Sequence, residues 1–362
     1  MKNSSEINLN TPNNQIYVSE EITLLKEKLL DLKKKVNKIL LIQPLQIEED
    51  KIDIKIALNK RYYMYPPYGI GILNKVLKNN NYTSDVLDLN FETFSYIHEK
   101  KNISYDDLTK KWKSKLIEKL EKYKPDLVGV SCTFTMNHKN MMDVFHEVKK
   151  FDQKIITIAG GVHVSNATEI VLKEGKNINF ASTYESEVSF VDFINFINNK
   201  NDDLSQLAFV KNDKFYEIKK RKNPNGEHID IIPDFGDLEL DKLTNLGEIG
   251  TFRYWRPKNS KGSAVLANKG CRARCSFCSV RNFNGKGVRQ KPTQTVIDEI
   301  KSLQDNYGIN HITWLDDDLL YDVNRTLELF NGIVKQNLKI TWDASNGLIA
   351  SAAVAHPELI DA

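Results

Sequence analysis

The sequence contains no apolar run close to the ~20 residues that a helix needs to cross a bilayer, so a membrane span is not expected. Residues 1–14 are polar and rich in Asn and Ser, and they lack the apolar core of a signal peptide. The formal net charge is only +3, so no strong field indicates nucleic acid as a partner. These absences predict a cytoplasmic protein that does not bind nucleic acid.

Cysteine is also scarce, with four residues in a chain of 362. Three of them, Cys271, Cys275 and Cys278, fall in one short stretch, whereas Cys132 lies far away in the sequence. In a reducing compartment, clustered cysteines indicate a metal site rather than disulfides.

Hydrophobic residues make up 41% of the chain, which is enough for real cores, and the length predicts about two domains. Over residues 37–200, short apolar runs alternate with amphipathic segments. Strands are expected at 39–42, 84–89, 125–131, 154–159 and 178–181, and helices at 69–79, 105–122, 137–150, 166–174 and 187–198. This alternation predicts an α/β fold with a doubly wound, Rossmann-like sheet, in which ligands bind beyond the carboxyl ends of the strands.

The segments on either side of this domain lack its alternation of strands and helices. Residues 1–36 are predicted to be a disordered tail, up to residue 18, and then a helix from Ser19 to about Lys35. Residues 201–260 are predicted to be a linker that contains a hairpin around Asn212 and Asp213.

A second α/β series occupies residues 261–362. Strands are expected at 264–267, 311–315 and 339–343, and helices at 292–306, 324–336 and from Pro357. Three strand–helix units cannot close a barrel and leave an open parallel edge. We therefore expect the first part of a partial (β/α) barrel, a natural protein that continues beyond this sequence, and no activity from this fragment alone.

The three clustered thiols are ligands for zinc or for an iron–sulfur cluster. Structural zinc requires four protein ligands, and Cys132 and His311 are too distant in sequence to be assumed as the fourth. Three thiolates on a four-iron cube would leave one iron open for a ligand. The neighbouring Arg272, Arg274 and Arg281 are expected to favour the thiolate form.

The C-x₃-C-x₂-C spacing, with Phe277 before the third cysteine, resembles the radical S-adenosylmethionine superfamily. The order of the motifs that follow resembles the members that also bind cobalamin. These motifs are Gly270, Arg289, Val296–Ile300, Tyr307–Ile309, Trp314–Leu319, Asp322 and Arg325.

This resemblance implies that Cys271, Cys275 and Cys278 hold a [4Fe-4S] cluster whose open iron chelates S-adenosylmethionine. It also implies that Phe277 lies beside the adenine. The acidic pair at 316–317, Asp316 and Asp317, would reach the methionine amino group or the ribose. The alternative for the two aspartates is an ordinary acidic bias at the start of a helix.

Residues 37–200 resemble the cobalamin-binding domain that precedes the radical barrel in such enzymes. The resemblance rests on Pro66–Gly69, on the strand that ends at Ser131, and on the loop at 159–163. It implies that cobalamin contacts Ser131, Thr133, Gly160, Gly161 and His163. A backbone without Cβ atoms at the two glycines can approach a bulky ligand closely, although an ordinary Gly-Gly turn is the alternative.

Two departures from the family pattern are visible. The segment after the first strand has no Asp-x-His-x-x-Gly element, so no histidine is expected on the cobalt. Relatives carry Gly-Glu-Gly-Glu where this chain has Tyr184, Glu185, Ser186 and Glu187, and the loss of both glycines is expected to weaken the contact with the cobalamin tail.

The resemblance favours an enzyme that makes a deoxyadenosyl radical and methylates an unactivated carbon with cobalamin. Two alternatives remain: a radical oxidoreductase or cyclase whose first domain is a scaffold, and a non-catalytic module that binds metal or corrinoid. The implied partners are a small-molecule, lipid or natural-product substrate and an electron donor such as flavodoxin or ferredoxin.

Overall fold

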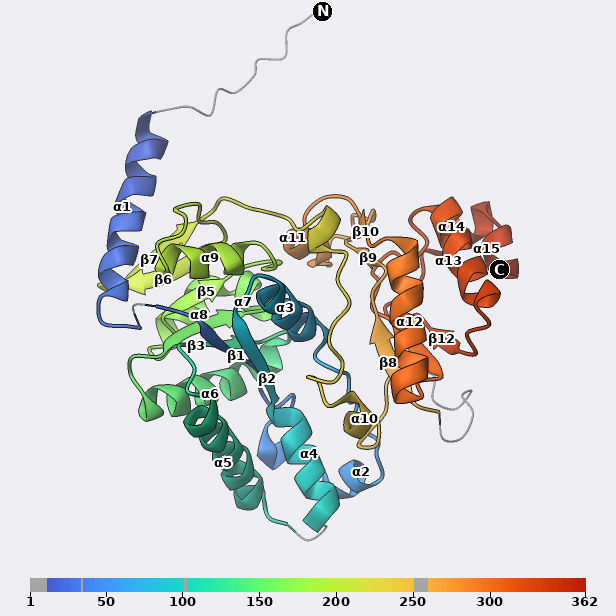
Figure 1. Cartoon of the computed structure of the whole chain (residues 1–362), viewed down its shortest axis with the longest axis horizontal. Helices are drawn as coiled ribbons and strands as arrows, with labels where there is room; N and C mark the ends of the chain where they lie inside the picture. The colour runs from blue at the N-terminus through green and yellow to red at the C-terminus, as the bar shows by residue number, and fades with distance from the viewer. Residues whose placement is uncertain (1–11, 34, 101–102, 251–259) are drawn as a thin grey trace, which may run out of the picture.

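The computed structural model describes residues 12–33, 35–100, 103–250 and 260–362. Two α/β domains lie side by side, with helix α3 and the segment that follows residue 218 running between them (Figure 1). Among the described residues, no helix is both long enough and apolar enough to cross a membrane.

The N-terminal domain is built on a seven-stranded sheet with the order β2-β1-β3-β4-β5-β6-β7. Its strands are β1 Lys38–Gln43, β2 Thr83–Asp88, β3 Leu127–Ser131, β4 Ile156–Gly160, β5 Phe180–Ser182, β6 Leu207–Lys211 and β7 Lys214–Ile218. The first five strands are parallel, β6 pairs antiparallel with β5, and β7 pairs antiparallel with β6. The strand order reverses beside β1, which confirms the predicted doubly wound fold and marks the usual place for a ligand.

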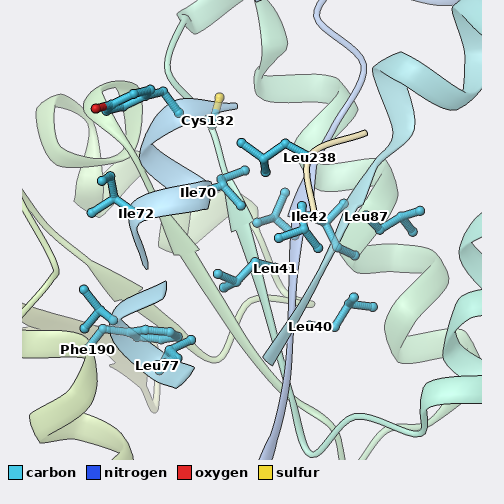
Figure 2. Packing of buried hydrophobic residues seen from close by; sticks show 14 of the residues in the cluster. Leu40, Leu41, Ile42, Ile70, Ile72, Leu77, Leu87, Cys132, Phe190 and Leu238 are labelled. Atoms are coloured by element: carbon cyan, nitrogen blue, oxygen red, sulfur yellow. The ribbon is translucent and has the colours of Figure 1, made fainter. Parts of the chain in front are cut away.

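Helices of this domain follow nearly every strand. They are α1 Pro12–Leu29, α2 Ile54–Leu58, α3 Tyr68–Asn79, α4 Leu89–Lys100, α5 Tyr105–Tyr123, α6 His138–Phe151, α7 Val162–Asn166, α8 Thr168–Glu174, α9 Ser189–Ile197 and α10 Leu240–Leu243. The central strands β1, β3 and β4 are buried on both faces, as parallel strands covered by helices are. Figure 2 shows apolar side chains of β1, α3 and α9 packed together, with Cys132 beside them.

The C-terminal domain has a three-stranded parallel sheet with the order β12-β11-β8 and a separate antiparallel ribbon of β9 and β10. Its strands are β8 Gly262–Val265, β9 Asn268–Lys269, β10 Arg289–Gln290, β11 His311–Trp314 and β12 Thr341–Asp343. Its helices are α11 Val280–Asn284, α12 Thr293–Tyr307, α13 Val323–Lys335, α14 Ala350–Ala355 and α15 Glu358–Asp361. Strand β12 lies at one edge of the sheet, as the sequence predicts.

Several elements differ from the sequence-based expectation. Helix α1 begins at Pro12 and ends at Leu29, earlier at both ends than predicted, while residues 1–11 of the predicted tail lie outside the described residues. The hairpin β6–β7, expected in a linker, instead extends the large sheet by pairing β6 with β5. The helix expected at 166–174 begins at Thr168, and a separate short helix, α7, precedes it, because Ala167 leaves helical geometry at φ −133°.

Candidate functional site

A cavity of about 800 Å³ lies between the two domains. From the N-terminal domain it is lined at the carboxyl ends of β3, β4 and β5, and from the C-terminal domain just beyond the ends of β8, β11 and β12. Leu266, Leu315 and Asn346 are the lining residues that follow those last three strands. The edges at which parallel sheets bind ligands therefore face the same space. A volume of this size suits a large organic ligand.

Five residues predicted from the N-terminal domain meet at this cavity: Ser131, Thr133, Gly160, Gly161 and His163 all line it. The loops after β3 and β4 are joined by their backbones, since Cys132 N–H donates to the Gly160 carbonyl at 2.8 Å and His163 N–H donates to the Cys132 carbonyl at 3.1 Å. Gly161 adopts φ +105°, and a Cβ there would lie 2.4 Å from the Cys132 carbonyl oxygen. Only glycine fits this close approach without strain.

His163 belongs to a chain of hydrogen-bonded side chains. One ring nitrogen lies 3.1 Å from Thr135 Oγ1 and the other 2.9 Å from the ring of His138, which in turn is 3.2 Å from Glu174. Burial, followed by the neighbouring His138, lowers the pKa of His163. Because both ring nitrogens are engaged by protein groups, His163 is poorly placed to act as a metal ligand.

The cysteine loop leaves the ribbon after Lys269 and returns at Arg289, two residues that pair across it. Cys275 and Cys278 are exposed and Cys271 is partly buried; all three are free thiols. The Ala273 N–H donates to Cys271 Sγ at 3.4 Å. The second half of the loop reaches the cavity through Ser279, Val280, Phe283 and Asn284.

These residues fit an iron–sulfur cluster in their chemistry. Thiols are the usual cluster ligands, and N–H donors to sulfur are a common second contact. Across the described ranges no three His, Cys, Asp or Glu side chains are already gathered as a metal site. Cys132 is fully buried and burial raises its pKa to about 12, while His311 is hydrogen-bonded to Thr341 and Asp343. Neither residue is placed to supply a fourth ligand.

Arg272 is engaged mainly by a carboxylate, and its expected effect on the thiolates stays a prediction. Its guanidinium forms a two-pronged ion pair with the buried Asp318, with Nε 2.7 Å and Nη2 2.9 Å from the carboxylate oxygens. Burial is the main cause that raises the pKa of Cys271. The Ala273 N–H lowers this pKa, and the charges of Asp318 and Asp317 raise it further. Arg272 therefore serves to fix the start of the loop to the segment after β11.

The two neighbouring aspartates Asp316 and Asp317 have different surroundings. Asp316 is buried, and its carboxylate accepts the N–H groups of Ala267 and Asn268 at 3.0 and 2.6 Å. Asp316 is not among the residues that line the cavity, and its predicted cofactor contact stays a prediction. Asp317 does line the cavity, and burial followed by Asp318 raises its pKa to about 6. The cofactor contact therefore stays a prediction for Asp317.

Phe277 is 91% exposed and lies outside the cavity lining. Its predicted place beside an adenine likewise remains a prediction. Lys269 is a cavity residue that the sequence did not reveal, whereas Tyr68, Glu185 and Glu187 lie in segments that carry the resemblance to the cobalamin-binding domain. The two glutamates at 185 and 187 are visible in the sequence as an acidic pair. Their basic partners, Lys269 and Arg289, are too far away in the sequence to be recognised.

Residues 54–194, which form most of the N-terminal domain, match the B12 binding domain family. Because of this match, residues 54–194 are called the B12-binding domain from this point on. The sheet edge of this B12-binding domain supplies the Gly160–Gly161 wall of the cavity, so the family match and the geometry indicate the same place.

Two curated relatives extend the likeness beyond the B12-binding domain. A cytidylyl-2-hydroxyethylphosphonate methyltransferase of Streptomyces wedmorensis is 22% identical over 305 residues, which are 78% of this chain and 56% of that protein. An uncharacterized methyltransferase of Pyrococcus horikoshii is 25% identical over 245 residues, or 67% of this chain and 50% of that protein. The chain thus spans about half the length of these relatives.

Solved structures show the same arrangement of domains. The radical S-adenosylmethionine methyltransferase TsrM of Kitasatospora setae superposes with a TM-score of 0.60 at 17% identity, over 83% of this chain and 51% of that chain. The cobalamin-dependent S-adenosylmethionine radical enzyme OxsB superposes with a TM-score of 0.62 at 16% identity, over 86% and 38%. The chain has the fold of cobalamin-dependent radical S-adenosylmethionine enzymes, as its motifs predict.

Proposed function

We propose that this chain carries the cofactor-binding part of a cobalamin-dependent radical S-adenosylmethionine enzyme that methylates an unactivated carbon. One observation carries the proposal: a single cavity is lined by the B12-binding domain on one side and by the part of the cysteine loop that follows Cys278 on the other. When bound, a reduced [4Fe-4S] cluster and S-adenosylmethionine would supply a deoxyadenosyl radical, and cobalamin would supply the methyl group.

The residues of the chain would bind and orient these groups. Cys271, Cys275 and Cys278 would hold the cluster. The backbone at Gly160 and Gly161 would lie against the corrin or its tail, where the absence of Cβ atoms gives room. The position of the cavity between two domains would limit the access of water to reactive species. We further propose a cytoplasmic enzyme with a small-molecule substrate and an electron donor such as flavodoxin or ferredoxin.

The proposal is tested by loading the chain anaerobically with cobalamin, iron and sulfide. We expect one corrin per chain in the absorption spectrum, and release of methionine and 5′-deoxyadenosine from S-adenosylmethionine after reduction. A chain that binds a cluster but no corrin would contradict the cobalamin role and favour a scaffold. A chain that binds both but never cleaves S-adenosylmethionine would contradict the radical chemistry.

Cobalamin bound to residues 37–200 is expected to carry no protein histidine on its cobalt. The loop that follows β1 contains no histidine, and both ring nitrogens of His163 are engaged within the protein. Electron paramagnetic resonance of the Co(II) form should therefore show no nitrogen splitting from an axial histidine, and His163→Ala should leave the spectrum unchanged. A nitrogen splitting that disappears in His163→Ala would contradict this prediction.

Replacing Asp317 by asparagine is expected to weaken S-adenosylmethionine binding by roughly 10- to 150-fold, because a charged hydrogen bond to the ligand contributes about 1.5–3 kcal/mol. Asparagine keeps the size and shape of the aspartate side chain, so the substitution is not expected to unfold the protein. Equilibrium dialysis on cluster-loaded protein measures the effect. Asp298→Asn, on the exposed side of α12, is the matched control. Equal affinity in both variants would remove Asp317 from the ligand site.

A further inference from the structure

The β9–β10 ribbon forms the base of the cysteine loop. Lys269 and Arg289 face each other across the ribbon, and Lys291 N–H donates to the Ala267 carbonyl at 2.9 Å just beyond it. Both ends of the loop therefore depend on the position of this ribbon.

One buried ionic cluster joins the ribbon to the B12-binding domain. Lys269 Nζ forms an ion pair with Glu187 and lies 3.3 Å from Glu185 Oε1, while Arg289 Nη2 lies 2.5 Å from Glu185 Oε2. The two glutamates lie between β5 and α9, and their side chains are only 4% and 9% exposed. Two cations face two carboxylates, so the cluster balances its own charge.

A second buried cluster joins the same ribbon to α3 of the B12-binding domain. Lys291 Nζ lies 2.8 Å from Glu299 Oε2 and 3.1 Å from the Tyr68 hydroxyl. The Tyr68 hydroxyl donates to Glu299 Oε1 at 2.8 Å. Tyr68 also lines the cavity, so the two clusters hold the ribbon where it borders that space.

The energetic effect of these ion pairs depends on how deeply they are buried. Exposed ion pairs contribute little, but removing one partner of a buried pair leaves an uncompensated charge in a low dielectric and is strongly unfavourable. A ribbon held by such pairs has few alternative positions. Arg325 adds to the restraint from within the C-terminal domain, since its Nη1 donates to Asn268 Oδ1 at 3.0 Å.

We propose that Glu185 and Glu187 are positioning residues that dock the β9–β10 ribbon onto the B12-binding domain and so set where the cysteine loop stands relative to the cavity. The two glutamates lie in the segment that departs from the family pattern by its two missing glycines. The docking itself is supported by the ion pairs between the glutamates and the ribbon. Its consequence, a fixed distance between cluster and cobalamin, rests on the proposed function.

Hydrogen–deuterium exchange of the whole chain tests the docking without any cofactor. In Glu185→Gln/Glu187→Gln, the amides of Ala267, Asn268 and Lys291, all hydrogen-bonded at the base of the loop, are expected to exchange on the order of tenfold faster or more. Amides of β3 and β4 should keep their wild-type rates. Asp305→Asn, which breaks an ion pair that is about half exposed, is the control and should change neither region.

Unchanged exchange at the ribbon in the folded variant would overturn the proposal. Faster exchange throughout β3 and β4 would also overturn it, because the glutamates would then stabilise the B12-binding domain itself. If the double variant does not fold, Lys269→Gln breaks the same cluster from the ribbon side and is judged by the same two criteria.

A second readout tests the consequence for the cofactors. The wild type and the double variant are compared at equal occupancy of Co(II) cobalamin and a reduced cluster, with cobalamin in excess. The double variant should lose or broaden the magnetic splitting between the two spins. A wild-type splitting in the variant would overturn the positioning role. If the wild-type chain binds neither cofactor, the proposed function fails while the exchange experiment still decides the docking.

Discussion

Cys271→Ala, Cys275→Ala and Cys278→Ala are each expected to reduce the iron content of the reconstituted chain from about four atoms to nearly none. The three thiols share one short loop, and each would supply one of only three protein ligands. Loss of one ligand leaves a cluster on two thiolates, which is not held. Iron and sulfide analysis, together with thiolate-to-iron absorption, measures the result.

Cys132→Ala is the matched control for these variants. Cys132 is fully buried in the N-terminal domain, and burial raises its pKa to about 12, so it has neither the exposure nor the charge of a ligand. Its replacement should keep full iron content and cost about 1–2 kcal/mol of unfolding free energy. One equivalent of zinc without iron in the wild-type chain would end the cluster hypothesis, and so would full iron content in all three loop variants.

Gly161→Ala is expected to lower the free energy of unfolding by about 3 kcal/mol or more and to abolish cobalamin binding. The backbone conformation at φ +105° is itself unfavourable for alanine, by roughly 1–3 kcal/mol. The added Cβ would also lie 2.4 Å from the Cys132 carbonyl oxygen, which is backbone and cannot rotate away. The loops after β3 and β4 would have to separate, and they form one wall of the cavity.

Gly160→Ala tests whether this effect belongs to position 161. A Cβ at Gly160 meets only the Ser182 carbonyl oxygen, at 3.7 Å, which is ordinary contact. This variant should stay within about 1 kcal/mol of the wild-type stability. Denaturant unfolding and corrin titration compare the two variants. Equal stability of both would show that the close approach at Gly161 is not a constraint on the fold.

Most strands could be predicted because each central strand is a short run of buried apolar residues between turns. The run at 39–42, for example, is buried on both faces of the sheet in β1. Helix α4 escaped prediction because it begins directly after β2 without a turn. Its start depends on Asp88, whose carboxylate accepts the Phe91 N–H at 2.9 Å. The pairing of the hairpin β6–β7 with β5 is a long-range contact that local pattern does not encode.

Some residues of the candidate site could likewise be predicted from the sequence, and others could not. The cysteines and the glycines after β4 could be found because their spacing is local and chemically specific. Asp316 could not be distinguished from Asp317 by sequence, because neighbouring residues of a turn point in different directions. Only the structure shows that Asp316 binds the backbone at Ala267 and Asn268 while Asp317 lines the cavity.

The sequence by itself determined the two α/β units, the three-thiol loop and the likeness to cobalamin-dependent radical enzymes, because these follow from periodicity and from spacing within a few residues. The tertiary structure decided that both sheets turn their carboxyl ends to one cavity, and that Glu185 and Glu187 hold Lys269 and Arg289. The Lys269–Glu187 contact joins residues 82 positions apart. Such a buried ion pair forms only when folding has removed both partners from water, so no local pattern in the sequence records it.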